Sequence, residues 1–300
     1  MASNPVEEQP WSWTRLRAFL ECPKLFEHQY IQNMELVKRP RAFLVGSAIH
    51  RFLEVWYATW DESQALKSVR GVFDNIDTSS FSKEEMDQYH NDYAMVLGIC
   101  PAYAKVYLPD KDNFSSILTE QKFKFSFGKH SFLGYVDLLV KDKEGKWWIM
   151  ETKTRSMSTN ISNEFRSSYI NGQLLSQAYG ARQSLKIPVQ GVIFNIIKKP
   201  GIRLRKGETR EAYRNRVIIE YTQHYQAKGY FQRFEMMLDK RHVENFLKST
   251  KATLMVARKF YKDGFFPLNS QACDGKYGQC AFLSACLSGK YSSLLYRRKQ

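Results

Sequence analysis

The chain has 300 residues, of which 43% are hydrophobic and 14% aromatic. A chain of this length and composition can bury a sizeable core, which excludes a disordered tail and a miniprotein held together by disulfides. Its 45 lysines and arginines outnumber 30 acidic residues and give a formal net charge of +15. This excess indicates a polyanionic partner such as nucleic acid, with a basic solvated surface as the plainer alternative.

The cellular compartment is predicted from the N-terminus and the apolar runs. No run of about 18 apolar residues occurs, so we expect no membrane helix and no membrane partner. Residues 1–10 contain Glu7 and Glu8 and have no apolar stretch, unlike a signal or transit peptide. We therefore expect a cytoplasmic protein whose five cysteines are thiols or metal ligands rather than disulfides.

The first third of the chain is predicted to be helical. Ser12 is placed to cap a helix through Glu21, and Pro23 suits the first turn of a second helix that ends near Tyr30. In residues 46–60 the apolar side chains of Ile49, Phe52, Leu53 and Trp56 recur at three- and four-residue spacings, which is typical of a helix. Further helices are predicted over 46–60, 62–75 and 83–107.

The middle of the chain changes to strand patterns. Three segments rich in β-branched and aromatic residues are predicted as strands, at 117–127, 132–140 and 147–154. The last two flank a turn at 142–145, which indicates a hairpin. The remaining predicted elements are a helix over 163–185, strands at 189–197, 216–221 and 231–237, and a helix over 240–261. This order predicts a mixed α/β fold, with a central mixed β-sheet flanked by helices, rather than alternating βαβ units.

Two carboxylates and a lysine are predicted to meet on this hairpin. Glu151 and Lys153 are two residues apart in a strand, so they share one face of the sheet. Folding the hairpin brings Asp137 opposite residue 150 or 151. Carboxylate oxygens are the ligands that Mg²⁺ or Mn²⁺ prefers, and such an ion activates water and stabilises charge on a phosphate. The alternative is a hairpin with ordinary surface charges.

Polar residues on two helices are candidate neighbours of this patch. His50 begins the 46–60 helix and offers an imidazole to the same ion, with Glu54 one turn further on. Gln173 and Gln177 are four residues apart on one face of the helix that follows the hairpin. Each also has a structural interpretation, because a lone helical histidine often serves packing and exposed amides often serve solubility. Glu120, on the preceding strand, is a further candidate near the metal.

The motifs in chain order resemble a known family. They are a Cys-Pro helix, Gly-Ser-Ala-Ile-His at 46–50, Gly-x-x-Asp at 134–137, Glu-Thr-Lys at 151–153 and a helix with Gln and Tyr. Together they resemble the PD-(D/E)XK nuclease superfamily, and within it the RecB-like branch of helicase-associated (AddB-type), CRISPR-associated and phage exonucleases. The resemblance implies a restriction-endonuclease-like core with a helical N-terminal part and a C-terminal cysteine loop. It also implies His50, Asp137 and Glu151 as metal ligands and Lys153 as the catalytic lysine.

One motif departs from the family pattern. The family's helix commonly carries Gln-x-x-x-Tyr, but Leu175 stands four residues before Tyr179. The role of the glutamine then falls to Gln177 or Gln173, or is lost, and Gln177 is favoured.

The cysteines are candidates for a metal centre. Cys273, Cys280 and Cys286 lie close together near the C-terminus. With a fourth thiolate they suit a [4Fe–4S] cluster or a zinc ion equally well on ligand type. The resemblance implies a cluster held by these three cysteines and Cys22. It leaves Cys100 as a buried cysteine that is not a ligand. Such a cluster joins the N-terminal helix (about 12–32) to the C-terminal segment (about 262–290) within one domain spanning 1–300.

A basic segment at 198–216 is the candidate DNA-binding region. Pro200, Gly201 and Gly207 indicate a loop whose cations follow a phosphate backbone, or else a mobile solvated loop. The candidate DNA-binding residues are Lys198, Lys199, Arg203, Arg205 and Lys206, together with Tyr179.

The sequence therefore predicts a Mg²⁺- or Mn²⁺-dependent deoxyribonuclease with an iron–sulfur cluster. The favoured activity is an exonuclease on single-stranded DNA ends, in recombination, repair, or phage or CRISPR DNA processing. Two alternatives stay open: a non-catalytic DNA-binding or assembly subunit, and a nuclease active only with a helicase. No G-x-x-x-x-G-K-[ST] motif occurs, so a motor would be another chain. The predicted catalytic residues are Lys153, Glu151, Asp137 and Gln177.

Overall fold

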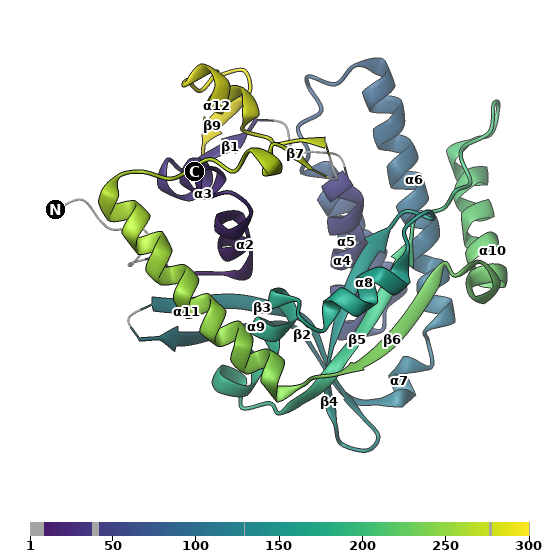
Figure 1. Cartoon of the computed structure of the whole chain (residues 1–300). Helices are drawn as coiled ribbons and strands as arrows, with labels where there is room; N and C mark the ends of the chain where they lie inside the picture. Colours follow the sequence, from purple (N-terminus) through teal and green to yellow (C-terminus); the bar gives the residue numbers. More distant parts are fainter. Residues whose placement is uncertain (1–8, 38–41, 129, 276–277, 300) are drawn as a thin grey trace.

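The centre of the protein, a computed structural model shown in Figure 1, is a mixed five-stranded sheet in the order β2-β3-β4-β5-β6. The structure describes residues 9–37, 42–128, 130–275 and 278–299. Neighbouring strands are antiparallel except β4 and β5, which are parallel. The strands are β2 (Phe114–Phe127), β3 (His130–Asp142), β4 (Trp147–Arg155), β5 (Val189–Lys198) and β6 (Phe231–Met237). The predicted mixed α/β fold with a central mixed sheet is confirmed.

The β3–β4 hairpin closes where the turn was predicted. Asp142 accepts a hydrogen bond from Lys146 N at 2.8 Å, and Gly145 adopts a φ of +85°, which favours glycine. In the hairpin register Leu138 pairs with Met150. The next positions outward are 137 and 151, so this register carries Asp137 toward Glu151.

One face of the sheet is covered by the helices of the first third and by α10. Asp61 and Ser82 begin two of these helices, since their side chains accept hydrogen bonds from Gln64 N and Glu85 N. These helices pack their apolar sides on the strands in one continuous core. The elements are α4 (Ala42–Thr59), α5 (Glu62–Asp74), α6 (Lys83–Val106) and α10 (Arg210–Lys228). The short polar helix α7 (Asp110–Asn113) leads into β2.

The opposite face of the sheet carries a second core. Ser12 accepts from Arg15 N at 3.2 Å and begins α2, as predicted. The helices on this side are α2 (Trp13–Glu21), α3 (Pro23–Phe26), α8 (Ile161–Ser168), α9 (Gly172–Gly180) and α11 (Lys240–Asp263). None of the helices in the described ranges is long and apolar enough to cross a bilayer.

Two predicted elements are wrong. Residues 216–221 lie inside α10 and form no strand. Val217 and Tyr221 are buried one turn apart while Ile219 is exposed, which is helical periodicity despite the β-branched composition. The helix predicted over 163–185 is divided, because α8 ends at Ser168 and Asn171 begins α9 by accepting from Gln173 N. A π-helical turn, Ala181–Leu185, then follows α9.

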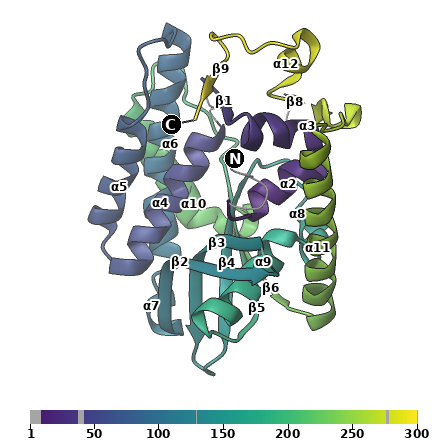
Figure 2. The ribbon, with the colours of Figure 1, turned by 90° about the vertical axis from the view of Figure 1, so that its left-hand side faces the viewer.

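The two ends of the described chain pack together (Figure 2). Strand β1 (Met34–Leu36) pairs antiparallel with β9 (Tyr296–Arg298), and a small third core lies beside them. Lys24 N donates to Pro267 O at 3.2 Å, and Asn269 Nδ2 donates to Glu21 O at 2.8 Å. The remaining elements are a π-helical turn (Glu27–Ile31), a 3₁₀ turn (Ser270–Ala272), β7 (Asp274–Gly275), β8 (Gly278–Gln279) and α12 (Leu283–Ser288).

Candidate active site

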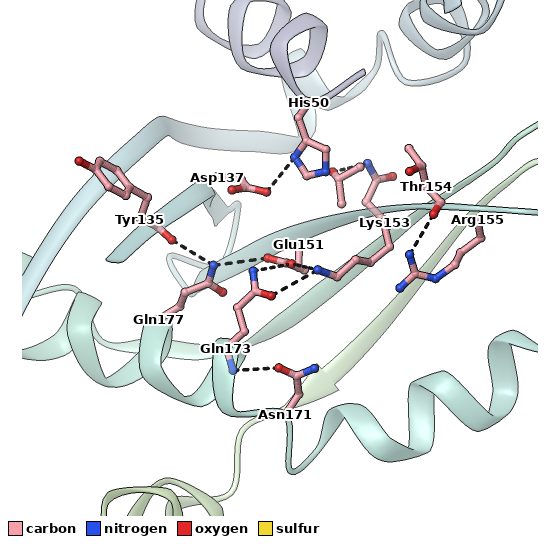
Figure 3. Close-up of polar contacts among 12 residues, drawn as sticks. His50, Tyr135, Asp137, Glu151, Lys153, Thr154, Arg155, Asn171, Gln173 and Gln177 are labelled. Carbon is pink, nitrogen blue, oxygen red and sulfur yellow. Dashed lines mark hydrogen bonds and ion pairs between the residues drawn. The ribbon is translucent and has the colours of Figure 1, made fainter. Parts of the chain in front are cut away.

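Glu151 and Lys153 lie on one side of β4, facing α9 (Figure 3). Glu151 is only 1% exposed, and its Oε1 lies 2.5 Å from Lys153 Nζ. A carboxylate this deeply buried is stable as an ion only when it is paired and hydrogen-bonded. Lys153 is the partly exposed member of the pair, so its ammonium group is the one that can reach a ligand.

Helix α4 brings His50 to Asp137, in the middle of β3. His50 Nδ1 lies 3.0 Å from Asp137 Oδ2, and both side chains are partly exposed. Burial lowers the pKa of His50, but the hydrogen bond and charge of Asp137, with the charge of Glu151, outweigh it and hold this pKa above its ordinary value. The contact with Asp137 therefore favours the protonated form of His50. An imidazole that ligates a metal must be neutral, so an ion would compete with this proton.

Two amides on α9 hold both oxygens of Glu151 (Figure 3). Gln173 Nε2 donates to Glu151 Oε1 at 2.9 Å, and Gln177 Nε2 donates to Oε2 at 3.4 Å. Gln173 Oε1 also accepts from Lys153 Nζ at 3.4 Å. The sequence favoured Gln177, whereas the structure places both amides at the carboxylate and gives Gln173 the shorter contact. Asn171 ends the preceding segment and caps α9, because its side chain accepts a hydrogen bond from Gln173 N. The first turns of α9, which carry Gln173 and Gln177, therefore face β4.

Gln177 leaves one acceptor unused. Its Nε2 also donates to Tyr135 O at 3.1 Å, but its buried Oε1 has no hydrogen-bond partner among the described residues. A buried acceptor without a donor costs stability, and such atoms usually mark the place of a water, an ion or a ligand. The buried Oε1 of Gln177, beside Glu151, is thus an acceptor that a further donor or an ion would satisfy.

Glu120 on β2 adds negative charge near Asp137. The β2–β3 register brackets the two residues, since Thr119 pairs with Leu138 and Gln121 with Val136. Burial raises the pKa of Glu120, and the charges of Asp137 and Glu54 raise it further. Glu120 also has a φ of +48°, an uncommon conformation for a residue with a side chain. Glu54, one turn after His50 on α4, accepts a hydrogen bond from Arg51 Nη1 at 2.5 Å.

A polar cavity of about 620 Å³ opens beside Lys153. Glu151, Lys153 and Arg155 form its floor, and Leu174 and Phe194 are its apolar contacts. Its volume is in the range of pockets that hold small ligands. The rest of its lining is hydroxyl and amide groups, from Ser156, Ser158, Thr159, Asn160, Ser167, Ser168, Asn171 and Gln173.

Comparison with known proteins decides the family. A model of the PD-(D/E)XK nuclease superfamily matches residues 10–287. The chain belongs to the PD-(D/E)XK nuclease superfamily. Membership supports nuclease activity, and the five-stranded sheet with its flanking helices is the restriction-endonuclease-like core expected from the sequence.

Solved structures and curated proteins complete the comparison. The crystal structure of a candidate exonuclease from Eubacterium rectale has 11% identity and a TM-score of 0.52, over 97% of this chain and 92% of that one. A phage-related exonuclease from Haemophilus somnus has 9% identity and a TM-score of 0.37, over 85% of this chain and 96% of that one. At this identity, the first similarity shows the fold alone. No curated protein matches the chain significantly.

Superfamily nucleases generally use Mg²⁺ or Mn²⁺, and the donor types in this site fit such an ion. Asp137, Glu151 and the unused oxygen of Gln177 are hard oxygen donors. The arrangement itself is not that of a closed metal site, because no three His, Cys, Asp or Glu side chains in the described ranges are placed to hold one ion. Binding by His50, Asp137 and Glu151 together would therefore require their side chains to move.

The structure gathers the predicted cysteines from both chain ends. Burial raises the pKa of Cys280 and Cys286, and the nearby thiols of Cys22 and Cys273 raise both further. The four sulfurs therefore lie within electrostatic reach of one another, although within the described part of the chain they are not closed around an ion. Cys100 is buried in α6, apart from this group.

His28 is a neighbour of the cysteine group that the sequence did not reveal. Its Nε2 lies 3.2 Å from Cys286 Sγ, its Nδ1 lies 2.6 Å from Tyr291 OH, and its ring stacks on Phe282. These partners are more than 250 residues away in the chain, so no local pattern indicates them.

The basic segment at 198–216 is partly neutralised. Arg216 binds Glu208 at 2.7 Å and Arg210 binds Asp87 at 2.8 Å. Lys199 and Arg203 line a second cavity of about 720 Å³ between this segment, α4 and α6. Lys198 ends β5 beside Arg155, while Arg205 and Lys206 lie in the exposed part of the loop.

Tyr179 packs in the second core. Its ring packs edge-on against Phe125 at 4.9 Å, in the second core, and it is half-buried. Its predicted contact with DNA stays a prediction.

Proposed function

We propose that this chain is a metal-dependent deoxyribonuclease that degrades single-stranded DNA from its ends. The observation that carries the proposal is the buried Glu151, held by Lys153 and by two amides, next to the His50–Asp137 pair. A fold needs no such arrangement for stability alone, since buried ion pairs contribute little net stability. The order of the motifs supports the RecB-like branch of the superfamily.

Each residue has a separate task in this proposal. A Mg²⁺ or Mn²⁺ ion held by His50, Asp137 and Glu151 would act as a Lewis acid and supply an activated water. The ammonium group of Lys153, at the edge of the cavity, stabilises negative charge on a phosphate oxygen. Gln173 and Gln177 fix the orientation of Glu151 through its two oxygens.

The cavity beside Lys153 supports a single-stranded substrate. Its hydroxyl and amide lining suits a sugar and a phosphate, and its volume of about 620 Å³ suits a nucleotide rather than a duplex. The net charge of +15 supports a nucleic acid as substrate. The basic segment begins beside the cavity, because Lys198 on β5 pairs with Arg155 on β4. The candidate contacts with the DNA backbone are Lys198, Lys199, Arg203, Arg205 and Lys206.

The proposal is tested with linear and circular single-stranded DNA in Mn²⁺ or Mg²⁺. We compare wild type with Glu151→Gln, and use Glu144→Gln as control, because Glu144 is an exposed carboxylate in the same hairpin. Wild type and control should degrade the linear DNA and spare the circle, and Glu151→Gln should bind DNA without cutting it. Rapid cutting of the circle contradicts the exonuclease assignment. If wild type binds but cuts nothing, the chain is a binding subunit or needs a helicase or another partner chain.

We also propose that Cys22, Cys273, Cys280 and Cys286 hold a [4Fe–4S] cluster. The support is chemical: four thiols from the two ends of the chain lie near one another, and four thiolates suit such a cluster. A ligand set that spans nearly the whole chain closes a very long loop, so binding would contribute strongly to folding.

Anaerobic purification tests the cluster. Wild type and Cys100→Ser should be brown and contain iron and acid-labile sulfide, whereas Cys280→Ser should lose colour and melt at a lower temperature. A colourless wild-type protein with one zinc ion per chain contradicts the cluster.

A further inference from the structure

Helix α11 carries a line of exposed lysines that has no part in the site described above. The helix runs from Lys240 to Asp263 and packs through Phe246, Leu254 and Ala257 onto the second core. Figures 1 and 2 show it along the outer side of the molecule. Its outward face carries Lys248, Lys251, Lys259 and Lys262, all exposed.

The four lysines form one line along the helix axis. At 3.6 residues per turn, the positions 248, 251, 259 and 262 fall within an arc of about 80°, so the four lysines share one face of the helix. From Lys248 to Lys262 the helix rises about 21 Å at 1.5 Å per residue. With one phosphate at each ammonium group, this line provides up to four phosphate contacts.

These lysines keep most of their charge available. Within the described ranges Lys259 pairs with Asp263 at 2.9 Å, whereas Lys248, Lys251 and Lys262 form no ion pair. The basic segment at 198–216 differs, because several of its arginines are bound to carboxylates. The positive charge of α11 is therefore more accessible to a ligand than that of the basic segment at 198–216.

An aromatic ring lies at the end of the lysine line. Phe265 follows the C-cap of α11, Gly264, and is 66% exposed, which is unusual for a side chain of this size. Proteins that bind single strands without sequence preference combine cations along the backbone with aromatic rings on which bases stack. The outward face of α11 and Phe265 together provide both.

We propose that Lys248, Lys251, Lys259, Lys262 and Phe265 form a surface that binds single-stranded DNA outside the catalytic cavity. The proposal rests on the proposed function for the identity of the polyanion. An anionic membrane is the less suitable partner, since a helix that lies on a bilayer buries its apolar face there. The main apolar face of α11 packs in the second core, and the helix exposes only Met255 and Val256 among its large apolar residues. Because α11 packs on α9, DNA held here is anchored to the helix that carries Gln173 and Gln177.

The test measures how binding depends on salt. The variant replaces the four lysines with glutamine, which keeps helix propensity and removes four charges. The control removes four charges from exposed positions on α5 and α6, by Lys67→Gln, Arg70→Gln, Lys83→Gln and Lys105→Gln. Binding of a labelled single-stranded oligonucleotide is followed by fluorescence anisotropy without divalent metal, so that no cleavage occurs, and melting temperatures verify folding.

The expected result is quantitative. Each phosphate contact contributes about 0.7 to the slope of log K against log salt for single strands, so the α11 variant should lose about 3 units of slope. The control should keep the wild-type slope. Equal slopes for variant and control overturn the proposal, as does wild-type binding to anionic vesicles in preference to DNA.

A second variant separates stacking from charge. Phe265→Ala should weaken binding to an oligonucleotide and leave binding to an abasic strand of the same length unchanged. Equal losses on both strands contradict a stacking role for Phe265. Wild-type cleavage is measured in parallel. If the wild type cleaves DNA and the four-lysine variant keeps the wild-type salt slope, this inference alone is overturned. If the wild type does not cleave DNA and the variant has a reduced salt slope, the nuclease proposal alone is overturned.

Discussion

Asn195 donates a hydrogen bond to the hydroxyl of Thr152 at 3.0 Å, on β4 between Glu151 and Lys153. Successive side chains in a strand point to opposite faces of the sheet. Thr152 therefore points away from Glu151 and Lys153, toward the face that α4, α6 and α10 cover. Asn195 is 0% exposed and Thr152 1% exposed. Across the sheet, Thr152 pairs with Asn195 and Asn195 with Arg233.

This polar row continues into the helices. Arg233 binds both oxygens of Asp110, at 2.9 and 2.6 Å, and the hydroxyls of Tyr57 and Tyr103, at 2.7 and 2.8 Å. Tyr57 lies two helical turns after His50 on the same face of α4. One buried network therefore contacts both the strand that carries Glu151 and the helix that carries His50.

Thr152→Val is expected to lower stability and cleavage together. The substitution keeps the shape of the side chain but leaves the amide of Asn195 without its acceptor, at a cost of about 1–3 kcal/mol in the free energy of unfolding. Thr152→Ser keeps the hydroxyl and should lose less. Urea unfolding and cleavage rates of both variants check this, and equal stability of the two contradicts the role of the hydrogen bond.

Gly172→Ala is expected to disturb the contact between α2 and α9. A Cβ atom at this position would lie 2.0 Å from the ring of Trp13, and Gln173 is the next residue. The control is Gly71→Ala in α5, where nothing lies within 4 Å. That change should stabilise the protein by roughly 0.5–1 kcal/mol. Calorimetry should show opposite shifts of the melting temperature, and a Gly172→Ala protein as stable as wild type refutes the close packing.

Glu208→Gln is expected to strengthen binding to single-stranded DNA. The hydrogen bond from Arg216 lowers the pKa of Glu208 to about 2, helped by the bond from Arg205 N, so the contact persists at neutral pH. A depressed carboxyl pKa means that its stabilising contact is lost only as the pH falls toward about 2.

Glu211→Gln is the control, because its contact with Arg214 is longer, at 3.7 Å. Anisotropy titrations should show higher affinity and a steeper salt dependence for Glu208→Gln than for Glu211→Gln. Unchanged affinity for Glu208→Gln would mean that Arg216 does not face DNA.

Local chemistry explains which elements were predictable. The cap at Ser12 and the turn at 142–145 depend on residues a few positions apart, and both agree with the structure. The strand predicted at 216–221 failed because β-branched composition in a short window outweighed the four-residue spacing of Val217 and Tyr221. The break before α9 was missed because Asn171 lies within an otherwise helical pattern.

The candidate site was predictable only where strand periodicity determines it. Residues two apart on β4 share a face, so the proximity of Glu151 and Lys153 followed from the sequence. The choice between Gln173 and Gln177 did not, because both occupy one helix face and both contact Glu151. The Thr152–Asn195 bond joins positions 43 residues apart, and no local pattern encodes such a pairing.

Single-turnover cleavage of end-labelled single-stranded DNA by Lys153→Ala tests the central claim most directly. The control is Lys146→Ala, an exposed lysine in the same hairpin. Loss of a group that stabilises charge on the reacting phosphate should slow cleavage by on the order of 100-fold or more, while DNA binding and the melting temperature stay close to those of wild type. Cleavage by Lys153→Ala at the rate of the Lys146→Ala control would contradict the assignment of this site.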